Sequence, residues 1–406
     1  MNIFDVLTLI GGLCLFLFGM NLMGDALERS AGSKLEIMIG KLTTGKLAGL
    51  LTGLGVTAVI QSSSATTVMV VGFVNSKLMT LKQAIHVIMG ANIGTTVTAW
   101  ILSLSGISGS NMFLKLLKPS SFTPVLALIG IILLMFTKSN KKKDIGVVLL
   151  GFATLMFGME TMTGAVSGLK DIPAFQEMFL MFTNPILGVL VGAILTAIIQ
   201  SSSASVGILQ ALAATGAVSY GAAIPIIMGQ NIGTCITAIL SSVGTTKNAR
   251  RAALVHLSFN VIGTIVCLGA FAAIRAIFAP VLLNESATFA GIATAHSIFN
   301  IVCTLLLLPM SGLLEKIAYK LIPDTAQVEK VSELDDRLLA TPAIALECAH
   351  NLTFDMAKIA TDALRSSIEC LGTYDKSKAE AIREAEDKTD HLEDVIGSYL
   401  VKLSTK

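Results

Sequence analysis

The sequence predicts an all-α polytopic membrane protein with two inverted-topology repeats. Each repeat has a re-entrant hairpin and a broken helix, and a short cytoplasmic helical tail follows them. Three observations lead to this prediction. The 406-residue chain has a mean hydropathy of +0.76 and only 14% charged residues, which excludes an ordinary soluble domain. A polar motif recurs inside apolar sequence, and basic residues gather on alternate connections between the apolar spans.

Seven segments approach the length of about 20 apolar residues that crosses the hydrocarbon core of a membrane. We expect a transmembrane domain over residues 1–322, with repeat one at 5–138, repeat two at 145–241 and extra spans within 252–320. The charged stretch 25–46 suits an interfacial helix, and an amphipathic stretch continues the last span to Ile322. The predicted crossings are residues 6–24, 83–103, 122–137, 145–167, 222–241, 252–278 and 289–308.

The recurring motif is a run of polar side chains with apolar sequence on both sides. Residues 61–67 read Gln-Ser-Ser-Ser-Ala-Thr-Thr and residues 200–205 read Gln-Ser-Ser-Ser-Ala-Ser, with an offset of 139 between Gln61 and Gln200. The same offset pairs Asn-Ile-Gly-Thr at 92–95 with Asn-Ile-Gly-Thr at 231–234. Hydroxyl and amide groups are costly in hydrocarbon unless they are bonded. Two matched runs therefore indicate a duplicated membrane unit whose copies share a substrate and ion site.

The segments around these motifs predict irregular backbone at membrane depth. Residues 47–75 and 184–214 are too long for one crossing and too interrupted for two. Each is predicted to be a re-entrant hairpin with the Gln-Ser-Ser-Ser run at its tip. Glycines, an asparagine and threonines occupy the middle of 83–103 and of 222–241. We expect both of these helices to unwind there and restart.

The number of crossings and the basic residues determine the predicted orientation. If each hairpin returns to the side from which it entered, repeat one crosses an odd number of times, and repeat two is inverted. Basic residues favour the side of the tail by fifteen to four, so that side is cytoplasmic and the N-terminus lies outside the inner (plasma) membrane. The tail side holds Arg29, Lys34, Lys41, Lys46, Lys77, Lys82, Lys138, Lys141, Lys142, Lys143, Lys247, Arg250, Arg251, Lys316 and Lys320; the other side holds Lys115, Lys118, Lys170 and Arg275.

The composition becomes polar at residue 323, and residues 323–406 are predicted to form a cytoplasmic helical region. Two helices make a poor domain alone, so either another chain completes the bundle or the region is an incomplete version of a longer one. The helices are defined by apolar residues at helical spacing. These are Leu352, Met356, Ile359, Ala363 and Ile368 in one helix, and Ala381, Ala385, Leu392, Ile396 and Leu400 in the other.

Twin Gln-Ser-Ser-Ser runs, each followed by Asn-Ile-Gly-Thr, resemble the bacterial branch of the type II sodium-dependent phosphate cotransporter family. The tail resembles the beginning of the PhoU-like helical region that members of this branch often carry. The resemblance implies two inverted repeats with the serine runs at the hairpin tips. It also implies that phosphate and sodium bind between the tips near the middle of the membrane.

Two sets of polar side chains are the predicted ligands. Hydroxyl groups, glutamine amides and free N–H groups at helix starts can donate to phosphate, and hydroxyl and amide oxygens suit sodium. The predicted phosphate ligands are Gln61, Ser62, Ser63, Ser64, Gln200, Ser201, Ser202 and Ser203. The predicted sodium ligands are Ser64, Thr66, Asn92, Thr95, Thr96, Ser203, Ser205, Asn231 and Thr234.

Several alternatives stay open for individual residues. Small polar residues can also serve as contacts between packed membrane helices. His256 with Asn260, and His296 with Asn300, are spaced to share a helix face, which favours bonding between helices over ligand binding. Glu160 is an acid inside a predicted span, and it either binds a cation or is satisfied by neighbouring donors.

The predicted function is a secondary active symporter that couples inward sodium movement to phosphate uptake by alternating access. A phosphate-sensing receptor that signals through the tail, and a transporter of another oxyanion, are the alternatives. No base accompanies the serine runs, so no enzyme is expected. Sodium is the co-substrate, and no organic cofactor is expected. The partners are inorganic phosphate, sodium and the lipid bilayer, without nucleic acid, and the sequence leaves a homodimer open.

Single cysteines test the predicted orientation. In a cysteine-free background, an impermeant thiol reagent applied to whole cells should label Ser110→Cys and spare Ser139→Cys. The reason is that the connection containing residue 110 is predicted to be external and the one containing residue 139 cytoplasmic. Lysed cells, in which both positions react, serve as the labelling control. The reverse pattern would contradict the inverted-repeat prediction.

Overall fold

The computed structural model is helical in the part of the chain that it describes, apart from one isolated bridge between Ser219 and Ser286. It describes residues 3–31, 43, 45–107, 116, 118–171, 184–278, 281–324, 334–340 and 342–405. The α-helices are α1 (Ile3–Ala31), α3 (Lys46–Ile60), α4 (Ser63–Asn75), α5 (Leu81–Ser103), α7 (Pro119–Phe136), α8 (Asn140–Val166), α10 (Pro185–Ile199), α11 (Ser202–Ala213), α12 (Tyr220–Ser241), α13 (Lys247–Phe278), α14 (Phe289–Leu307), α15 (Ser311–Leu321), α16 (Pro342–Gly372) and α17 (Lys376–Ser404). Short 3-10 helices are η1 (Leu104–Gly106), η2 (Ser167–Asp171), η3 (Val281–Asn284) and η4 (Asp336–Ala340).

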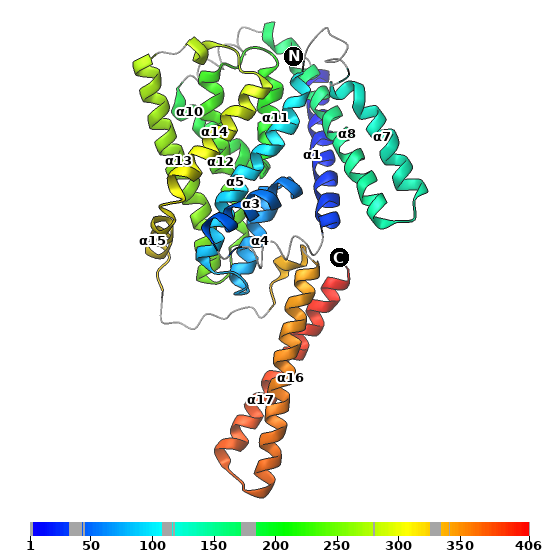
Figure 1. Ribbon diagram of the computed structural model, residues 1–406, viewed down its shortest axis with the longest axis vertical. Coiled ribbons are helices and arrows are strands. Elements are labelled where there is room, and N and C mark those ends of the chain that lie inside the picture. Colours follow the sequence, from blue (N-terminus) through cyan, green and yellow to red (C-terminus); the bar gives the residue numbers. More distant parts are fainter. Residues whose placement is uncertain are drawn as a thin grey trace.

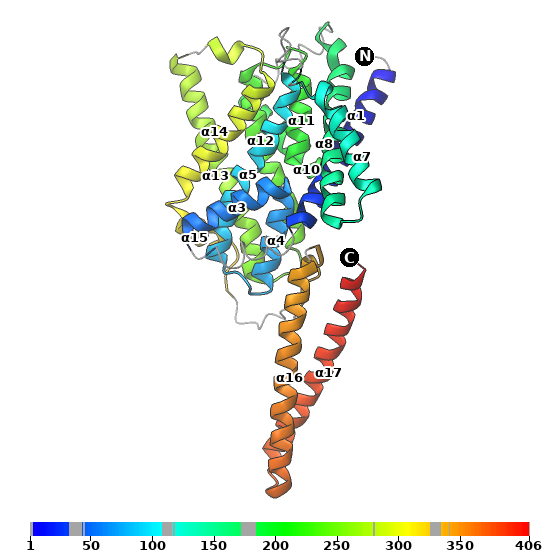
Figure 2. The ribbon, with the colours of Figure 1, turned by 45° about the vertical axis from the view of Figure 1, so that its right-hand side comes forward.

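Figure 1 shows two groups of packed helices and a projecting tail. The larger group contains α5 and α10 to α14, with the short helices α3 and α4 toward its lower end. The smaller group, α1, α7 and α8, lies along one side of the larger one. α16 and α17 extend away from both groups as a long helical pair, and Figure 2 shows the same arrangement after rotation.

The seven predicted crossings coincide with seven described helices that are long and apolar enough to span a membrane. The four shorter apolar helices α3, α4, α10 and α11 are the arms of the two predicted hairpins. α1 continues to Ala31, so residues 25–31 extend the first span and do not form the separate interfacial helix that the sequence predicts. Residues 32–42 and 44 of that predicted helix lie outside the described residues. The amphipathic stretch after the last span is a separate helix, α15.

The predicted breaks in the two central helices, α5 and α12, are wrong. Both helices are continuous. Their asparagines bond within their own helix: the Asn92 amide donates to the Ile88 carbonyl oxygen at 3.1 Å, and the Asn231 amide donates to the Ile227 carbonyl oxygen at 2.8 Å. A continuous helix satisfies its own backbone groups in lipid, so a polar side chain with a local partner does not have to interrupt it.

The glycines of these central helices allow close packing. A Cβ atom added at Gly90 would lie 1.9 Å from the carbonyl oxygen of Leu50 in α3. A Cβ atom added at Gly229 would lie equally close, 1.9 Å, to the carbonyl oxygen of Val189 in α10. The first arm of each hairpin therefore packs backbone to backbone against its central helix, which requires a residue without a side chain.

Two matched hydrogen bonds attach α13 and α14 to the central helices. His256 Nε2 lies 3.2 Å from Asn92 Oδ1 in α5, and His296 Nε2 lies 3.3 Å from Asn231 Oδ1 in α12. All four side chains are buried. The bonding between helices that the sequence favours for these histidines is confirmed, and the same motif asparagine holds a neighbouring helix in both halves of the chain.

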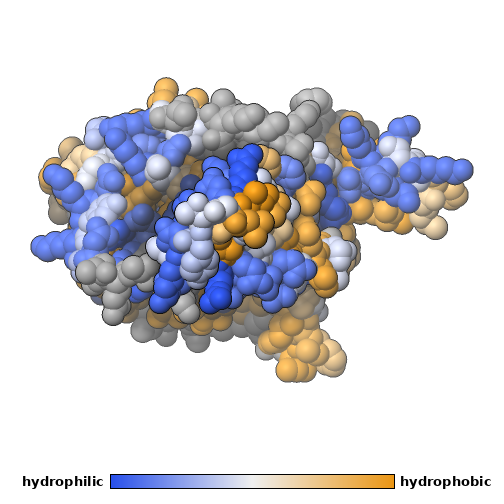
Figure 3. Space-filling model, turned by 90° about the horizontal axis from the view of Figure 1, so that it is seen from below, coloured by the Kyte–Doolittle hydropathy of each residue, from blue (hydrophilic) through white to orange (hydrophobic). Residues whose placement is uncertain are grey.

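The tail forms the two predicted amphipathic helices. Leu392, Ile396 and Tyr399 of α17 are buried, whereas Phe354 and Leu364 of α16 are 70% and 63% exposed. The pair therefore buries one apolar stripe and leaves another open, as two helices without a third must do. Seen from the tail side, the surface shows hydrophilic and hydrophobic areas side by side (Figure 3).

A buried carboxylate joins the tail to the apolar helices. Asp335 Oδ2 accepts hydrogen bonds from Asn75 Nδ2 at 2.7 Å and from Arg337 Nη1 at 2.9 Å. The Asp335 carbonyl oxygen accepts from the Tyr399 hydroxyl of α17 at 2.9 Å. Asn75, the last residue of α4, also accepts the Thr246 N–H through Oδ1 at 2.8 Å. One acid thus links the first hairpin, the α12–α13 connection and the tail.

Gly90→Ala tests the packing of α3 on α5. The added methyl group would overlap the Leu50 carbonyl oxygen, and overpacking of this kind costs about 1–3 kcal/mol. The melting temperature of the purified protein should therefore fall. Gly11→Ala is the matched control, because nothing lies within 4 Å of a Cβ atom at that position. Equal melting temperatures for the two variants would contradict this account of the packing.

Candidate functional site

The first serine run forms the bend between α3 and α4, where the sequence places a hairpin tip. α3 ends at Ile60, and Gln61 takes a left-handed backbone conformation with φ of 62°. A residue other than glycine adopts this conformation at a cost of about 1–3 kcal/mol. Ser62 then caps α4, because its Oγ accepts the Ala65 N–H at 3.1 Å. The bend thus ends α3 at Ile60 and allows α4 to begin at Ser63, two residues later.

The second serine run folds in the same way between α10 and α11. Gln200 has φ of 58°, and Ser201 caps α11 by accepting the Ala204 N–H through Oγ at 3.2 Å. Each left-handed glutamine also ends its helix with a backbone bond to a threonine one turn back, at 2.8 Å in the first hairpin and 2.7 Å in the second. The repeated sequence therefore produces a repeated local structure.

A hydrogen bond behind each bend ties the two arms of the hairpin together. Thr57 Oγ1 donates to Thr66 Oγ1 at 3.0 Å in the first hairpin. Thr196 Oγ1 donates to Ser205 Oγ at 2.8 Å in the second. All four side chains are fully buried. These contacts fix the angle between the arms, and with it the direction in which each tip faces.

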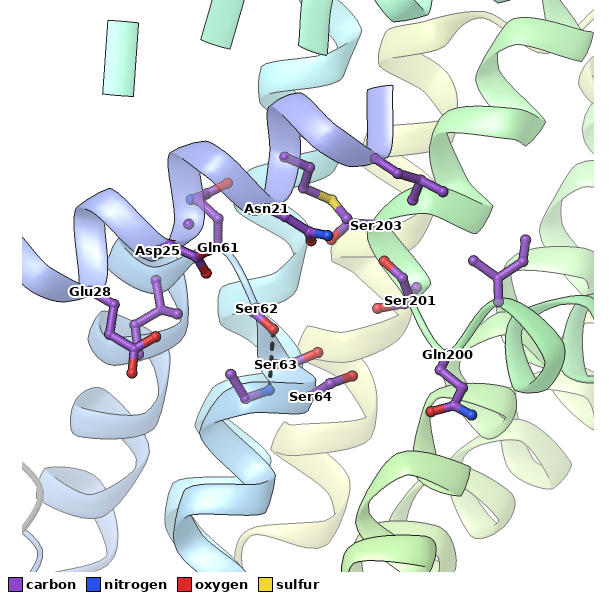
Figure 4. Close-up of a pocket in the computed structure, with 17 residues that line it drawn as sticks. Asn21, Asp25, Glu28, Gln61, Ser62, Ser63, Ser64, Gln200, Ser201 and Ser203 are labelled. Atoms are coloured by element: carbon purple, nitrogen blue, oxygen red, sulfur yellow. Dashed lines mark hydrogen bonds between the residues drawn. The ribbon is translucent and has the colours of Figure 1, made fainter. Parts of the chain in front are cut away.

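The two tips face one cavity of about 360 Å³, which is in the lower part of the usual range for ligand pockets, about 300–1,000 Å³. Both serine runs and α1 contribute to its lining (Figure 4). All eight predicted phosphate ligands line this cavity: Gln61, Ser62, Ser63, Ser64, Gln200, Ser201, Ser202 and Ser203. The structure therefore brings together two motifs that lie 139 residues apart.

Three buried serine side chains line this cavity and form no hydrogen bond among the described residues. Ser63, Ser202 and Ser203 are 4%, 5% and 7% exposed. They lie in the first turns of α4 and α11, where backbone N–H groups lack partners within the helix and the helix dipole is positive. Both helix starts therefore offer donors to an anion in the cavity.

Three polar residues of α1 complete the cavity, and the sequence-based prediction of ligands missed them. Asn21, Asp25 and Glu28 are spaced at i, i+4 and i+7, which places them on one helix face, and all three line the cavity. Figure 4 shows all three on α1 at the cavity. The spacing was a usable signal, but the prediction of an interfacial helix from residue 25 obscured it.

The charge of the cavity is negative. Its described lining includes two acidic residues and no lysine, arginine or histidine. An anion in this cavity would be held by neutral hydroxyl and amide donors and by two helix N-termini, each equivalent to about half a positive charge. Such a site binds an anion well only if a cation accompanies it.

Comparison with known proteins agrees with this geometry. A family model described as Na+/Pi-cotransporter matches residues 15–164 and 172–296, which include both hairpins and the cavity face of α1. The chain belongs to the Na+/Pi-cotransporter family. A model of the PhoU domain matches residues 354–406 of the tail. No solved structure matches the chain.

Three relatives show the spread of this family. The chain is 27% identical over 405 residues to the "Putative inorganic phosphate export protein YjbB" of Salmonella typhimurium (strain LT2), covering 98% of this chain and 71% of the relative. It is 31% identical over 311 residues to the "Uncharacterized protein YqeW" of Bacillus subtilis (strain 168), covering 76% and 95%. A 94-residue stretch is 42% identical to the "Sodium-dependent phosphate transport protein 2B" of Homo sapiens, covering 22% and 14%.

The residues predicted as sodium ligands divide between the cavity and the packed interior. Two of the nine, Ser64 and Ser203, line the cavity. The other seven form hydrogen bonds to the opposite hairpin arm, to a histidine or to a carbonyl group of their own helix. They are Thr66, Ser205, Asn92, Asn231, Thr95, Thr96 and Thr234. The structure thus gathers the predicted phosphate ligands more completely than the predicted sodium ligands.

Glu160 lies outside the cavity. Its side chain is exposed on α8, and it does not belong to the cavity lining. Asn21, its counterpart at the 139-residue offset, does line the cavity. Glu160, the acid that the sequence places inside a span, is therefore not part of the candidate site.

The two halves of the site differ at the tip glutamine. Gln61 is 7% exposed, donates through Nε2 to the Ala58 carbonyl oxygen, and accepts from Thr98 Oγ1 at 3.0 Å. Gln200 is exposed. The buried hydroxyl of Thr237, the repeat counterpart of Thr98, has no partner among the described residues. The first tip is therefore bonded to its central helix, and the second is not.

Ser63→Ala and Ser202→Ala test the two halves of the cavity separately. Each change removes the hydroxyl of a buried serine that forms no hydrogen bond among the described residues, and the loss of a hydrogen bond to a charged group costs about 1.5–3 kcal/mol. Each variant should therefore bind phosphate at least tenfold more weakly in calorimetry on the purified protein. Ser105→Ala is the control, because its hydroxyl contacts Met156 away from the cavity. Unchanged phosphate affinity in both cavity variants would mean that the serine runs serve only as packing contacts between helices.

Proposed function

We propose that this protein is a secondary active symporter that moves inorganic phosphate into the cell together with sodium by alternating access. The single observation that carries the proposal is the cavity between the two serine tips. The hydroxyls of its buried serines and its paired helix N-termini are donors that suit an oxyanion. The Na+/Pi-cotransporter family supports sodium and phosphate as the pair of ions.

The proposed architecture is two inverted repeats, each with a re-entrant hairpin. The 15 residues of α3 extend about 22 Å and the 12 residues of α11 about 18 Å, and both are shorter than a hydrocarbon core of about 30 Å. Arg29, near the end of α1, bonds to Asp144, near the start of α8, which supports opposite directions for these repeat counterparts. In this architecture the N-terminus lies outside the inner membrane and the tail lies in the cytoplasm.

Sodium supplies the charge that the cavity lacks. Phosphate carries about 1.5–2 negative charges near neutral pH, and two helix N-termini supply about one positive charge together. Ser64 and Ser203 are the proposed ligands that phosphate and sodium share. The seven interior residues of the predicted sodium set would have to exchange existing hydrogen bonds before they could bind sodium. We therefore propose that the coupled sodium ion binds in the cavity and not among these interior residues.

The proposed direction of transport follows from the sodium gradient. A relative from Salmonella is named for phosphate export, and the human relative is named for sodium-dependent phosphate transport. Sodium is more concentrated outside cells, so phosphate that moves with sodium moves inward. Uptake is therefore the direction that a sodium symporter with this cavity would drive.

Phosphate and sodium binding should be reciprocally coupled, because each ion compensates for the charge of the other. Calorimetry on the purified protein should show phosphate affinity that is higher in sodium than in choline by about tenfold or more at equal ionic strength. Phosphate should raise the sodium affinity by the same factor. Equal phosphate affinity in both salts would contradict the role of sodium as countercharge.

One observation favours a second candidate function, a phosphate sensor that signals through the tail. Asp335 bonds to Asn75 at the end of α4, and α4 begins at the first serine tip. Its carbonyl oxygen bonds to Tyr399 of α17. A movement of the first hairpin on phosphate binding would therefore reach the tail directly.

Flux separates the symporter from the sensor. Proteoliposomes with an inward sodium gradient should accumulate labelled phosphate, and liposomes in choline should not. A sensor would bind phosphate in the calorimeter without any flux. Unlabelled sulfate should compete poorly, and stronger accumulation of labelled sulfate than of phosphate would identify a transporter of another oxyanion.

A further inference from the structure

The face of α1 that lines the cavity carries a pair of carboxylates. Asp25 and Glu28 are three residues apart, so their side chains lie on the same side of the helix. Figure 4 shows both on α1, with Glu28 farther along the helix than Asp25. Asp25 is exposed to the cavity and Glu28 is half-buried.

These two carboxylates form no ion pair at contact distance in the described part of the chain, and the Arg29 charge is the described cation nearest in sequence to Glu28. Neither forms a hydrogen bond or an ion pair there. The adjacent basic residue, Arg29, bonds to Asp144 of α8 at 3.3 Å. The pair therefore lines a cavity that also offers donors to an anion, without a bonded cation among the described residues. Without a cation between them, an anion and this pair would repel each other.

The same end of the cavity provides neutral oxygen atoms. α3 ends at Ile60, where the last carbonyl groups of a helix have no partner within the helix. A Cβ atom added at Gly24 of α1 would lie 3.2 Å from the Ile60 carbonyl oxygen, so this oxygen reaches the α1 backbone next to Asp25. Carboxylate and carbonyl oxygens are ligands of hard cations in proteins.

A second feature of the cavity points independently to a bound ligand. Ser63 is 4% exposed and Ser202 is 5% exposed, and both line the cavity with hydroxyls that no described residue bonds. Buried polar groups in membrane proteins normally have partners. The unpartnered hydroxyls of these two buried serines are therefore available to a ligand in the cavity, and the carboxylates of the same lining favour a cation beside it.

The acid pair belongs to one half of the molecule alone. The 139-residue offset places Gly164 opposite Asp25 and Ser167 opposite Glu28, and neither carries a charge. A site built from the pair is therefore present at one end of the cavity and has no counterpart in the second repeat. Such a site can hold a coupling ion at one fixed position while the two hairpins exchange access.

We propose that Asp25 and Glu28, together with the Ile60 carbonyl oxygen, form a sodium site that adjoins the phosphate position. This inference rests on the proposed sodium-phosphate symport and names residues outside both predicted ligand sets. The bound sodium ion neutralises the acid pair and attracts the phosphate held by the serine tips. Coupling then arises because the cavity accepts phosphate only after the pair has bound its cation.

Asp25→Asn and Glu28→Gln test this site, because each keeps the shape of the side chain and removes its charge. Phosphate binding is measured by calorimetry while sodium replaces choline at constant ionic strength. Each variant should raise the sodium concentration for half-maximal effect by about tenfold, the loss expected for one charge-assisted contact. Phosphate affinity at saturating sodium should change far less. Glu160→Gln is the matched control, because it removes an acid of α8 outside the cavity.

The outcomes are distinguishable from a failure of the proposed function. If the wild-type protein binds phosphate equally in sodium and choline, the symport itself is wrong. If the wild-type protein responds to sodium and both variants respond in the same way, the acid pair is not the sodium site. Variants that keep their sodium response but lose a pH dependence seen in the wild type would assign the pair to a proton and would also overturn the proposal. Monodisperse elution and an unchanged melting temperature exclude misfolding as the cause of any loss.

Discussion

The requirement that every backbone polar group in a membrane be satisfied is the constraint on which this structure depends. Gln61 and Gln200 break two helices in apolar surroundings, and each break leaves N–H groups without helical partners. The caps of Ser62 and Ser201 satisfy part of this deficit. The remaining donors face a cavity in which an anion can accept from them. The groups that would destabilise an ordinary membrane helix are thus the groups that line the candidate site.

The surrounding helices hold the two hairpin tips with different sets of hydrogen bonds. The first tip is bonded to its central helix through Thr98, and its second arm is held at the far end by Asp335 of the tail junction. The second tip has neither contact among the described residues: Gln200 is exposed and the Thr237 hydroxyl is unpartnered. The second arm of the second hairpin is held instead by Gln210 of α11, whose side-chain amide donates to the Ala99 and Phe289 carbonyl oxygens at 3.2 and 3.0 Å.

Features set by neighbouring residues in the chain could be predicted from the sequence, and features set by contacts between distant helices could not. The hairpin bends at Gln61 and Gln200 follow from polar runs within apolar sequence, so they were predictable. The continuity of α5 was not, because the role of Gly90 depends on the approach of Leu50 from another helix. Asp25 and Glu28 were missed for a related reason. Their helical spacing was visible, but only the packing of α1 against the hairpins turns that face into the wall of a cavity.

The central claim is that the two tips form one binding site, and protection of cysteines tests it most directly. Ser64→Cys and Ser203→Cys are made singly in a cysteine-free background, and the rate of thiol labelling is measured as phosphate is added in sodium. One shared site predicts that both positions are protected with the same half-maximal phosphate concentration, and that choline abolishes protection at both. Protection at one tip alone, or at two clearly different phosphate concentrations, would contradict the account.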